Sequence, residues 1–418
     1  MVKEYIIESG NPKNKYLKVS IPGAKNSILP ILAATMLLPS KVKLFNVPKI
    51  NDINNMIKII ISLGGTVVWN DDFLEVDCTA IIGQKISFSL TEKVRSSILL
   101  VGPLTVIFGK SIIGLPGGCR LGLRPIDIHV NGLRSFGIKT SKENNKLVSQ
   151  STGLKPASYN LKFPSVGATE HLLITSLLIK GESILNNIAL EPEVLDLINF
   201  LKLAGADILR SQRRLKIEGG NKLSINQYRV IPDRIVAASW ITAAVITRTN
   251  LQLLDFPKKL LCDFLSVLKL IGVDIEYSEN DILISCPDKL SPFNITTGPF
   301  PEFSTDIQPF MAIIACTIKG ISRISELVYE NRFQYAEELK KLGADIQINE
   351  KTLYINGDRR LVGCTVIGKD IRGTAALGLA SLISDGETKL VDVGFISRAY
   401  EDFDKLLESF GAKVKSVI

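Results

Sequence analysis

The sequence is poor in the residues from which metal sites and disulfide frameworks are built. Only two of its 418 residues are histidine, His129 and His171, so a histidine-based metal centre is not expected. The six cysteines are scattered along the chain without paired spacing: Cys78, Cys119, Cys262, Cys286, Cys316 and Cys364. This pattern favours reduced thiols in the cytoplasm, and it argues against a disulfide framework or a zinc site.

A long hydrophobic run is also missing. The longest apolar stretches fall short of the ~20 residues that a membrane-spanning helix needs. Met1 leads into structured-looking sequence rather than into the apolar core of a signal peptide. We therefore expect no membrane segment, although hydrophobic residues make up 46% of the chain. The length of 418 residues predicts a globular protein of about two domains.

The net charge is +8, yet no basic run interleaved with aromatic residues is present, so a nucleic-acid partner is not expected. Two explanations of the charge stay open. Either it collects where small anionic substrates bind, or it is spread over the surface. The sequence does not give an oligomeric state, and a monomer is the working prediction.

A short phrase recurs six times: a large apolar residue or alanine, then glycine, two further residues, and in most copies Ile or Val. Its glycines are spaced by 67 to 73 residues and are Gly64, Gly137, Gly205, Gly272, Gly343 and Gly411. Six evenly spaced copies indicate an internal repeat. Each glycine ends an amphipathic helix such as Glu193–Ala204. A hairpin follows, such as Asp345–Asn349 with Thr352–Asn356.

A second helix in each repeat is apolar almost all round and is predicted to be buried. The six are Lys25–Leu38, Val94–Phe108, Val166–Ile179, Asp233–Thr247, Thr305–Thr317 and Ile371–Ser384. Four carry a cation near the N-terminus, where the helix dipole disfavours it: Lys25, Arg95, Arg234 and Arg372. A bound anion would resolve this conflict, since helix N-termini and basic side chains both bind anions. The alternative is that these cations extend to solvent.

Six such units, three to a lobe, predict an α/β protein of two lobes, with the helix N-termini directed into the cleft between them. The first lobe is expected over residues 22–230. The second is expected over residues 231–418 together with residues 1–21, because the alternating stretch Glu4–Ile21 has no partner in the first lobe.

The loop Leu115–Pro125 combines three glycines, two prolines, one thiol and two guanidiniums. Arg120 and Arg124 favour the thiolate of Cys119, which makes Cys119 a candidate nucleophile or acid. Both arginines also match phosphate and carboxylate groups. The alternative is a mobile surface loop with an incidental cysteine.

Together with motifs elsewhere, this loop resembles the family of UDP-N-acetylglucosamine enolpyruvyl transferases. The resemblance runs nearly end to end and rests on Gly23–Asn26, Leu115–Cys119, Arg124–His129, Pro164–Thr169, Ile231–Ile235, Thr305–Asp306, Glu330–Phe333 and Asp370–Arg372. It implies an inside-out α/β barrel in two lobes with the active site in the interdomain cleft. It also implies transfer of the enolpyruvyl group of phosphoenolpyruvate to the 3′-hydroxyl of UDP-N-acetylglucosamine, with release of phosphate. This reaction is the first committed step of peptidoglycan synthesis, on which cell shape and division depend, and no metal or organic cofactor is implied.

The resemblance also assigns roles to residues. Cys119 would protonate the methylene carbon of phosphoenolpyruvate and be alkylated by fosfomycin, and Asp306 would be the general base or a sugar ligand. Lys25, Arg124 and Arg398 would hold the phosphate and carboxylate of phosphoenolpyruvate. The other implied substrate-binding residues are Asn26, Arg95, Pro125, Ile126, Asp127, Ser165, Val166, Gly167, Val328, Arg332, Asp370 and Arg372. The sequence departs from the family's usual residues at Arg120, Val236, Phe395, Ser397 and Ala399.

Two rival interpretations stay open. One is an enolpyruvyl transferase of the same fold that acts on shikimate 3-phosphate. The other is a non-catalytic or RNA-end-processing relative built from the same repeat. The loop cysteine and the segment Gly23–Asn26 favour the sugar-nucleotide enzyme over the first rival. The presence of Cys119, Asp306 and Arg398 argues against the second.

Overall fold

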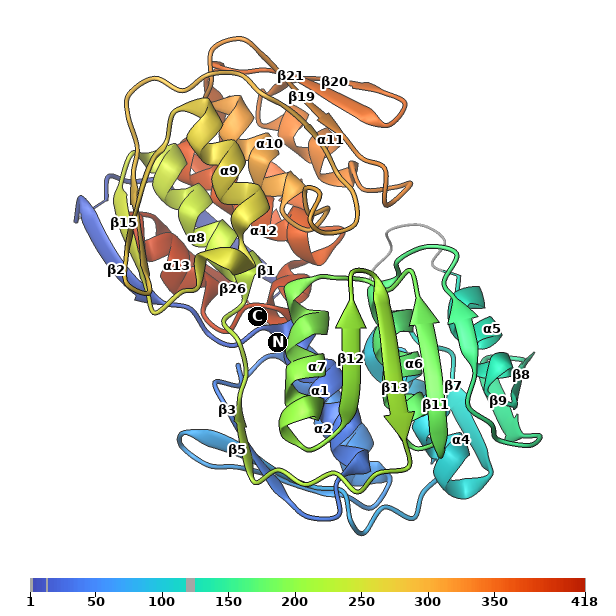
Figure 1. Cartoon of the computed structure of the whole chain (residues 1–418). Coiled ribbons are helices and arrows are strands. Elements are labelled where there is room, and N and C mark those ends of the chain that lie inside the picture. The colour runs from blue at the N-terminus through green and yellow to red at the C-terminus, as the bar shows by residue number, and fades with distance from the viewer. Residues whose placement is uncertain (1–2, 13, 118–124, 418) are drawn as a thin grey trace. The chain divides into compact units, whose positions relative to one another are not determined.

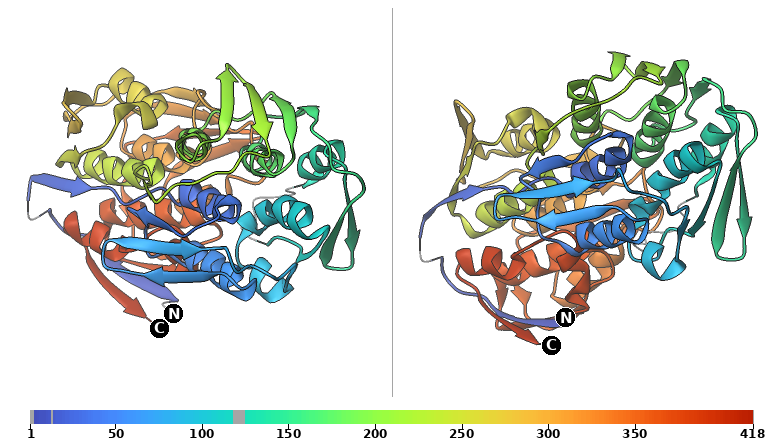
Figure 2. Two further views of the ribbon diagram at one scale, coloured as in Figure 1. Left: turned by 60° about the horizontal axis from the view of Figure 1, so that its bottom comes forward. Right: turned by 90° about the horizontal axis from the view of Figure 1, so that it is seen from below.

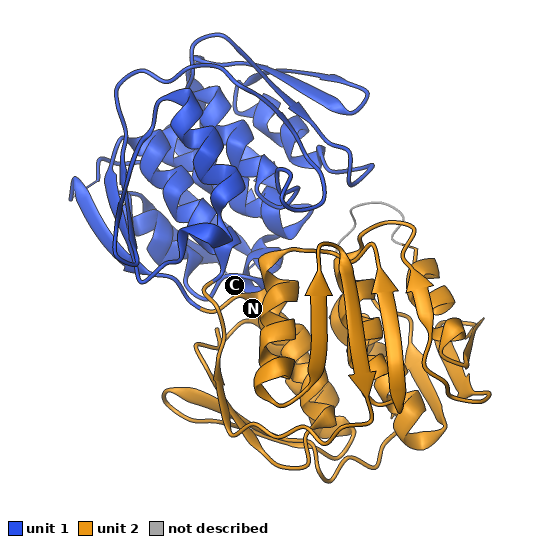
Figure 3. Cartoon of the chain, in the orientation of Figure 1, with its two compact units in different colours: residues 1–22, 119–123, 233–418 blue, residues 23–118, 124–232 orange. Residues whose placement is uncertain are grey.

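A computed structural model describes residues 3–12, 14–117 and 125–417 of the chain. Its described residues form two compact units (Figure 3). Unit 1 contains the described residues before 23 and after 232, and unit 2 contains those between 23 and 232. Cys119, Arg120 and Arg124, which carry the predicted loop chemistry, lie outside the described residues.

Each unit has a centre of three nearly all-apolar helical segments that pack against one another. In unit 2 these are α1 (Lys25–Ala34), the 3₁₀ turn Arg95–Leu100 with α4 (Val101–Phe108), and α6 (Val166–Leu177). In unit 1 they are α8 (Arg234–Thr247), α10 (Gln308–Cys316) and α12 (Ile371–Ala380). Figure 1 labels the helices α1, α4, α6, α8, α10 and α12. Most of their residues are fully buried, which follows from the absence of a polar face in their sequences.

Six four-stranded sheets formed by the described residues share one pattern of strand directions. In each sheet the first strand is parallel to the second, and the remaining neighbours are antiparallel. The sheets of unit 2, in that order, are β14 (Gln227–Arg229), β3 (Val42–Phe45), β5 (Phe73–Asp77) and β4 (Thr66–Trp69); β6 (Lys85–Ile86), β7 (Lys110–Gly114), β9 (Lys146–Ser151) and β8 (Ile138–Glu143); and β10 (Ser158–Asn160), β11 (Gly181–Asn186), β13 (Arg214–Gly219) and β12 (Asp207–Ser211).

The sheets of unit 1 follow the same rule, and a short pair, β22 (Leu361–Val362) and β24 (Ser384–Asp385), is added to them. They are β2 (Tyr16–Ser20), β15 (Asn250–Leu254), β17 (Asp281–Ser285) and β16 (Asp274–Ser278); β18 (Asn294–Thr296), β19 (Ile321–Ser325), β21 (Thr352–Asn356) and β20 (Asp345–Asn349); and β23 (Thr365–Ile367), β25 (Glu387–Val391), β1 (Glu4–Glu8) and β26 (Lys413–Val417). The predicted hairpin at residues 345–356 is confirmed, because β20 and β21 pair antiparallel.

Amphipathic helices precede the repeated glycines and pack near the strand that follows each glycine. They are α2 (Asn51–Ser62), α5 (Asp127–Ser135), α7 (Pro192–Leu203), α9 (Cys262–Ile271), α11 (Gln334–Lys341) and α13 (Phe403–Ser409). A further one-turn helix, α3 (Phe88–Thr91), precedes the 3₁₀ turn at Arg95. All six repeated glycines have φ between 79° and 107°, which only glycine adopts readily. The prediction that they end the helices is confirmed.

Both N-terminal strands pair within unit 1. Strand β1 lies between β25 and β26 and pairs antiparallel with both of them. Strand β2 runs parallel to β15. The two ends of the chain therefore come together, and the Lys3 amide donates to the Val417 carbonyl at 2.8 Å (Figures 1 and 2).

Three details differ from the sequence-based expectation. The helix predicted from Val94 begins as a 3₁₀ turn, because Pro103 has no N–H to continue an α-helical ladder. The helix predicted from Thr305 begins at Gln308, because residues 304–307 form a turn. The third difference concerns the barrel: each sheet formed by the described strands stays open at both edges, so the coarser description of a mixed α/β fold applies.

Within the described ranges, none of the helices combines the length and the apolar composition that crossing a bilayer requires.

The repeated glycines allow a matched stability test. Gly137 and Gly205 both lie in unit 2 and have φ of 79° and 99°. In Gly205→Ala an added Cβ has no heavy atom nearer than 4.0 Å, so only the left-handed backbone is strained, at a cost of about 1–2 kcal/mol. In Gly137→Ala the Cβ would also collide with the Gly153 carbonyl oxygen. We expect a clearly lower urea midpoint for Gly137→Ala than for Gly205→Ala, and equal midpoints would contradict the packing at Gly153.

Candidate functional site

Three of the four cations at the starts of the central helices do not extend to solvent. Lys25 is 8%, Arg234 6% and Arg372 4% exposed, and Arg95 is half-buried. The solvent alternative is therefore wrong for three of the four. A buried charge is tolerated only where other groups compensate it, so the neighbours of these side chains define the candidate site.

In unit 2, Lys25 is compensated by Asp52. Lys25 is the first residue of α1, and Asp52 lies in the first turn of α2. The Lys25 Nζ is 2.8 Å from the Asp52 Oδ2, and both side chains are buried. The sequence analysis did not single out Asp52. An acidic residue is common in the first turn of a helix, where it interacts favourably with the helix dipole, so the sequence gives no sign of a further role. Asn26, the next residue of α1, is half-buried.

In unit 1, Asp306 lies between two buried arginines. The Arg332 Nη2 donates to the Asp306 Oδ1 at 2.9 Å, and the Arg372 Nε donates to the Asp306 Oδ2 at 3.4 Å. The Asp306 side chain is 29% exposed, whereas the Arg332 side chain is 1% exposed. The carboxylate is thus the accessible member of the cluster, and each of its oxygens has a fixed donor.

Asp370 joins this cluster from the start of α12. Its Oδ1 accepts from the backbone N–H groups of Arg372 and Gly373 at 3.0 and 3.1 Å, which makes it the N-cap of the helix. The same oxygen is 3.5 Å from the Arg332 Nη1. Burial alone would lower the pKa of Arg332, but Asp370 and Asp306 raise it above its usual value. Arg332 therefore stays charged inside the protein.

Glu326 holds the backbone around this cluster, and the sequence analysis missed it. Its Oε2 accepts from the Thr305 hydroxyl at 2.9 Å, and its Oε1 accepts from the amides of Val328 and Tyr329 at 2.8 and 3.0 Å. Arg332 adds a bond from its Nε to the Thr305 carbonyl at 3.3 Å. The Glu326 carboxylate thereby links Thr305, the residue before Asp306, to the backbone at Val328. A glutamate four residues before the motif Glu330–Phe333 was the only available signal.

The other predicted residues of unit 2 lie at the starts of α5 and α6. Ser165 is the N-cap of α6, and its hydroxyl accepts from the Ala168 amide at 3.4 Å. Val166 and Gly167 form the first turn of that helix and are half-buried. Asp127 begins α5, after the exposed Pro125 and the half-buried Ile126. Of the predicted residues in unit 1, Arg398 is half-buried and ends the 3₁₀ segment Val393–Arg398.

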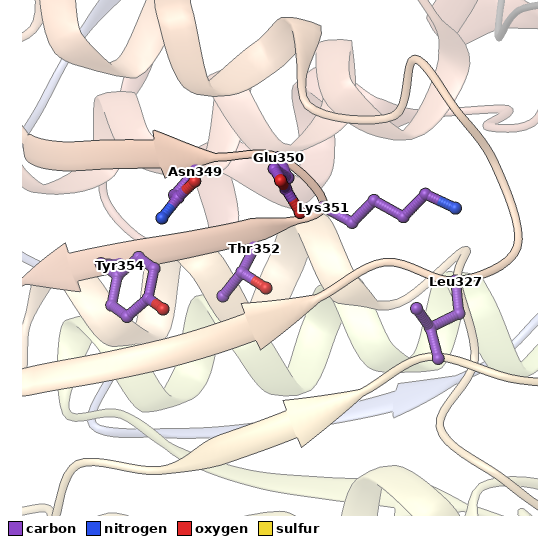
Figure 4. Close-up of a pocket in the computed structure, with 6 residues that line it drawn as sticks. All are labelled: Leu327, Asn349, Glu350, Lys351, Thr352 and Tyr354. Atoms are coloured by element: carbon purple, nitrogen blue, oxygen red, sulfur yellow. The ribbon is translucent and has the colours of Figure 1, made fainter.

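The structure thus brings together Asp306, Arg332, Asp370 and Arg372 in unit 1, and it places Lys25 beside Asp52 in unit 2. Among the described residues, no group of three or more His, Cys, Asp and Glu side chains is arranged to hold a metal ion. An open hollow at the β20–β21 hairpin is lined by Leu327, Asn349, Glu350, Lys351, Thr352 and Tyr354 (Figure 4). None of these six is a predicted site residue.

Comparison with known proteins places this arrangement in context. The chain is 38% identical over 404 residues to the UDP-N-acetylglucosamine 1-carboxyvinyltransferase of Pelagibacter ubique, with 96% of each chain covered. It is 36% identical over 403 residues to the Thermotoga maritima protein of the same name, again with 96% of each covered.

Two solved structures share the fold. The enolpyruvyl transferase NikO from Streptomyces tendae superposes with a TM-score of 0.89 at 23% identity, with 99% of each chain covered. The EPSP synthase from Acinetobacter baumannii gives a TM-score of 0.77 at 18% identity, with 99% of this chain and 100% of that chain covered. The family model of EPSP synthase (3-phosphoshikimate 1-carboxyvinyltransferase) matches residues 12–407. The chain therefore belongs to the EPSP synthase family of enolpyruvyl transferases.

Proposed function

We propose that the protein transfers the enolpyruvyl group of phosphoenolpyruvate to the 3′-hydroxyl of UDP-N-acetylglucosamine and releases phosphate, as the first committed step of peptidoglycan synthesis. The observation that carries the proposal is the 35–38% identity, over nearly the whole chain, to relatives named UDP-N-acetylglucosamine 1-carboxyvinyltransferase. The reaction adds the sugar oxygen to C2 and a proton to C3 of phosphoenolpyruvate. Loss of a C3 proton and of phosphate then restores the double bond.

Asp306 is the proposed base at the sugar hydroxyl. Proton removal needs a carboxylate within hydrogen-bond reach of that hydroxyl. Asp306 is the accessible carboxylate of its cluster, and Arg332 and Arg372 each hold one of its oxygens. A carboxylate held in a fixed orientation in this way suits a base that removes the proton of one particular hydroxyl group. Cys119 is the proposed acid, which would supply the proton to C3 of phosphoenolpyruvate.

The cations Lys25, Arg124 and Arg398 are proposed to hold the phosphate and carboxylate of phosphoenolpyruvate, with Arg95 and Arg372 adding to the positive field. The ion pair with Asp52, in which the Lys25 Nζ lies 2.8 Å from the Asp52 Oδ2, orients the ammonium of Lys25. Preorganised charges of this kind stabilise a multiply charged intermediate without reorganising during the reaction.

The remaining residues are proposed to contact the sugar nucleotide or the intermediate: Asn26, Pro125, Ile126, Asp127, Ser165, Val166, Gly167, Val328, Arg332 and Asp370. We further propose that the six repeats form the two lobes of an inside-out barrel, over residues 22–230 and over residues 1–21 with 231–418. A cytoplasmic location, fosfomycin sensitivity, roles in cell shape and division, the interdomain position of the site and a monomeric state stay predictions.

Phosphate release tests the proposal directly. Pure protein is incubated with phosphoenolpyruvate and either UDP-N-acetylglucosamine or shikimate 3-phosphate. Release is expected with the sugar nucleotide alone. Release with shikimate 3-phosphate alone would establish the rival acceptor. A salt-sensitive RNA gel shift without nucleotide binding would favour the RNA-processing relative.

Cys119→Ser tests the proposed proton donor. We expect kcat to fall about 100-fold or more, because a serine hydroxyl is a far weaker acid than a thiol. Labelling by fosfomycin should be lost as well. Cys262→Ser, at the exposed first residue of α9, is the matched control and should keep both properties. Full activity and labelling in Cys119→Ser would remove the thiol from the reaction.

Asp306→Asn tests the proposed base. The amide keeps the size of the side chain but cannot take a proton, so we expect kcat to fall about 100-fold or more while the sugar nucleotide still binds. Asp345→Asn removes a more exposed carboxylate, paired with Arg359 at 3.7 Å, and should leave kcat unchanged. Calorimetric binding and steady-state kinetics on both variants separate the two roles. An unchanged kcat in Asp306→Asn would reject Asp306 as the base.

A further inference from the structure

Glu326 is a buried carboxylate whose two oxygens bind two different segments of unit 1. It directly follows β19 and is 2% exposed. Its Oε2 accepts from the Thr305 hydroxyl at 2.9 Å and from the Gln308 Nε2 at 3.4 Å. Its Oε1 accepts from the amides of Val328 and Tyr329 at 2.8 and 3.0 Å. A buried carboxylate is tolerated where such donors replace water, and these four donors are uncharged.

The Oε2 side of Glu326 fixes the turn that carries Asp306. Thr305 is the residue before Asp306, and its hydroxyl donates to Oε2. The Thr305 carbonyl accepts from the Nε and Nη2 of Arg332 at 3.3 and 3.2 Å. The same guanidinium donates to the Asp306 Oδ1 at 2.9 Å. Both the backbone before Asp306 and its carboxylate are therefore held by the same set of buried side chains.

The Oε1 side of Glu326 fixes the segment that carries Val328. Residues 326–330 belong to no helix or strand, so secondary structure gives their amides no partners. The Leu327 amide donates instead to the Thr297 hydroxyl at 3.0 Å, and the next two amides donate to Glu326. The proposed function assigns Val328 to the sugar nucleotide. A buried side chain two residues earlier thus sets the backbone that would meet this ligand.

We propose that Glu326 is a positioning residue for the transfer reaction, with a separate role for each oxygen. Oε2 holds the turn of the proposed base Asp306, and Oε1 holds the backbone that binds the sugar nucleotide at Val328. Because one carboxylate joins both segments, the spacing between the base and the nucleotide contact is set before the substrate binds. The roles of Asp306 and Val328 rest on the proposed function, whereas the two sets of hydrogen bonds do not.

Thr305→Val tests the role of Oε2. Valine has the shape of threonine but no hydroxyl, so Oε2 loses the donor that fixes the turn. We expect kcat to fall about tenfold while the KM for the sugar nucleotide changes less than about twofold, since the Oε1 side is untouched. Thr305→Ser keeps the hydroxyl and should restore most of kcat. Thr317→Val is the matched control at the C-cap of α10, where the hydroxyl donates to the Ile314 carbonyl at 2.8 Å, and it should leave kcat unchanged.

Glu326→Gln and Glu326→Leu separate the two roles. Backbone amides can only donate, whereas the Thr305 hydroxyl can also accept, so the glutamine oxygen should face the amides and its NH2 group the Oε2 side. There the NH2 group meets that of Gln308, whose Oε1 is occupied by the buried Tyr335 hydroxyl. We therefore expect glutamine to lower kcat alone, by about tenfold. Leucine accepts from neither segment, so the KM for the sugar nucleotide should rise about tenfold as well.

Amide hydrogen exchange on the substrate-free protein measures the role of Oε1 by itself. The amides of Val328 and Tyr329 lie outside helices and strands, so slow exchange there depends on Glu326. We expect slow exchange in the wild type and in Glu326→Gln, and fast exchange in Glu326→Leu. Glu338→Leu is the matched control, because Glu338 is also 2% exposed and also binds a backbone amide, that of Ile367 at 3.1 Å. It should change neither these amides nor kcat.

A kcat of Thr305→Val equal to that of the wild type would overturn the proposal, and so would fast exchange at Val328 and Tyr329 in the wild type. A merely structural role would lower the thermal midpoints of Thr305→Val and Thr305→Ser without separating their kcat values. If the Glu326 variants do not fold, the Thr305 pair and the wild-type exchange still decide. A wild type that releases no phosphate with the sugar nucleotide would reject the proposed function, whereas an active wild type with an unaffected Thr305→Val would reject only the positioning role.

Discussion

The structure depends on carboxylates that neutralise cations buried at the starts of its central helices. A lysine or arginine there is unfavourable twice over, because it is removed from water and because it meets the positive end of a helix dipole. Asp52 offsets this cost for Lys25, and Asp306 offsets it for Arg372. Asp306 and Asp370 also compensate the buried Arg332, which lies before α11. Removing one partner of a buried pair typically costs about 3–5 kcal/mol, so these residues are constrained by stability as well as by chemistry.

Neutral clusters of this kind orient groups rather than attract ligands from a distance. Asp370 caps α12 and contacts Arg332, and Glu326 joins the turn before α10 to the backbone at Val328. Three segments far apart in the sequence are thereby fixed around the single partly exposed carboxylate of Asp306. A substrate that enters such a site meets groups whose positions are already set, which lowers the reorganisation that the reaction requires.

Much of the fold could be predicted from the sequence because the same two local patterns recur in each repeat. A glycine that must adopt positive φ follows each amphipathic helix, and the all-apolar helices have nowhere to lie except the core. The start of α10 was misplaced because Thr305 looks like an N-cap, whereas its hydroxyl is bound to Glu326 instead. The site cations were predicted, but their partners were not. Asp52 lies 27 residues after Lys25, and Glu326 lies 21 residues after Thr305. No local sequence pattern marks pairs so far apart.

The pairing of β1 between β25 and β26 has a consequence for the order of events during synthesis. Strand β1 is translated long before its partners β25 and β26, so this sheet of unit 1 cannot form until residues 387–417 have been made. Unit 2, whose strands all lie between residues 42 and 229, is translated in full well before that point. During that interval the residues of β1 have neither of their sheet partners, and an unpaired strand is the kind of segment that can associate with other chains.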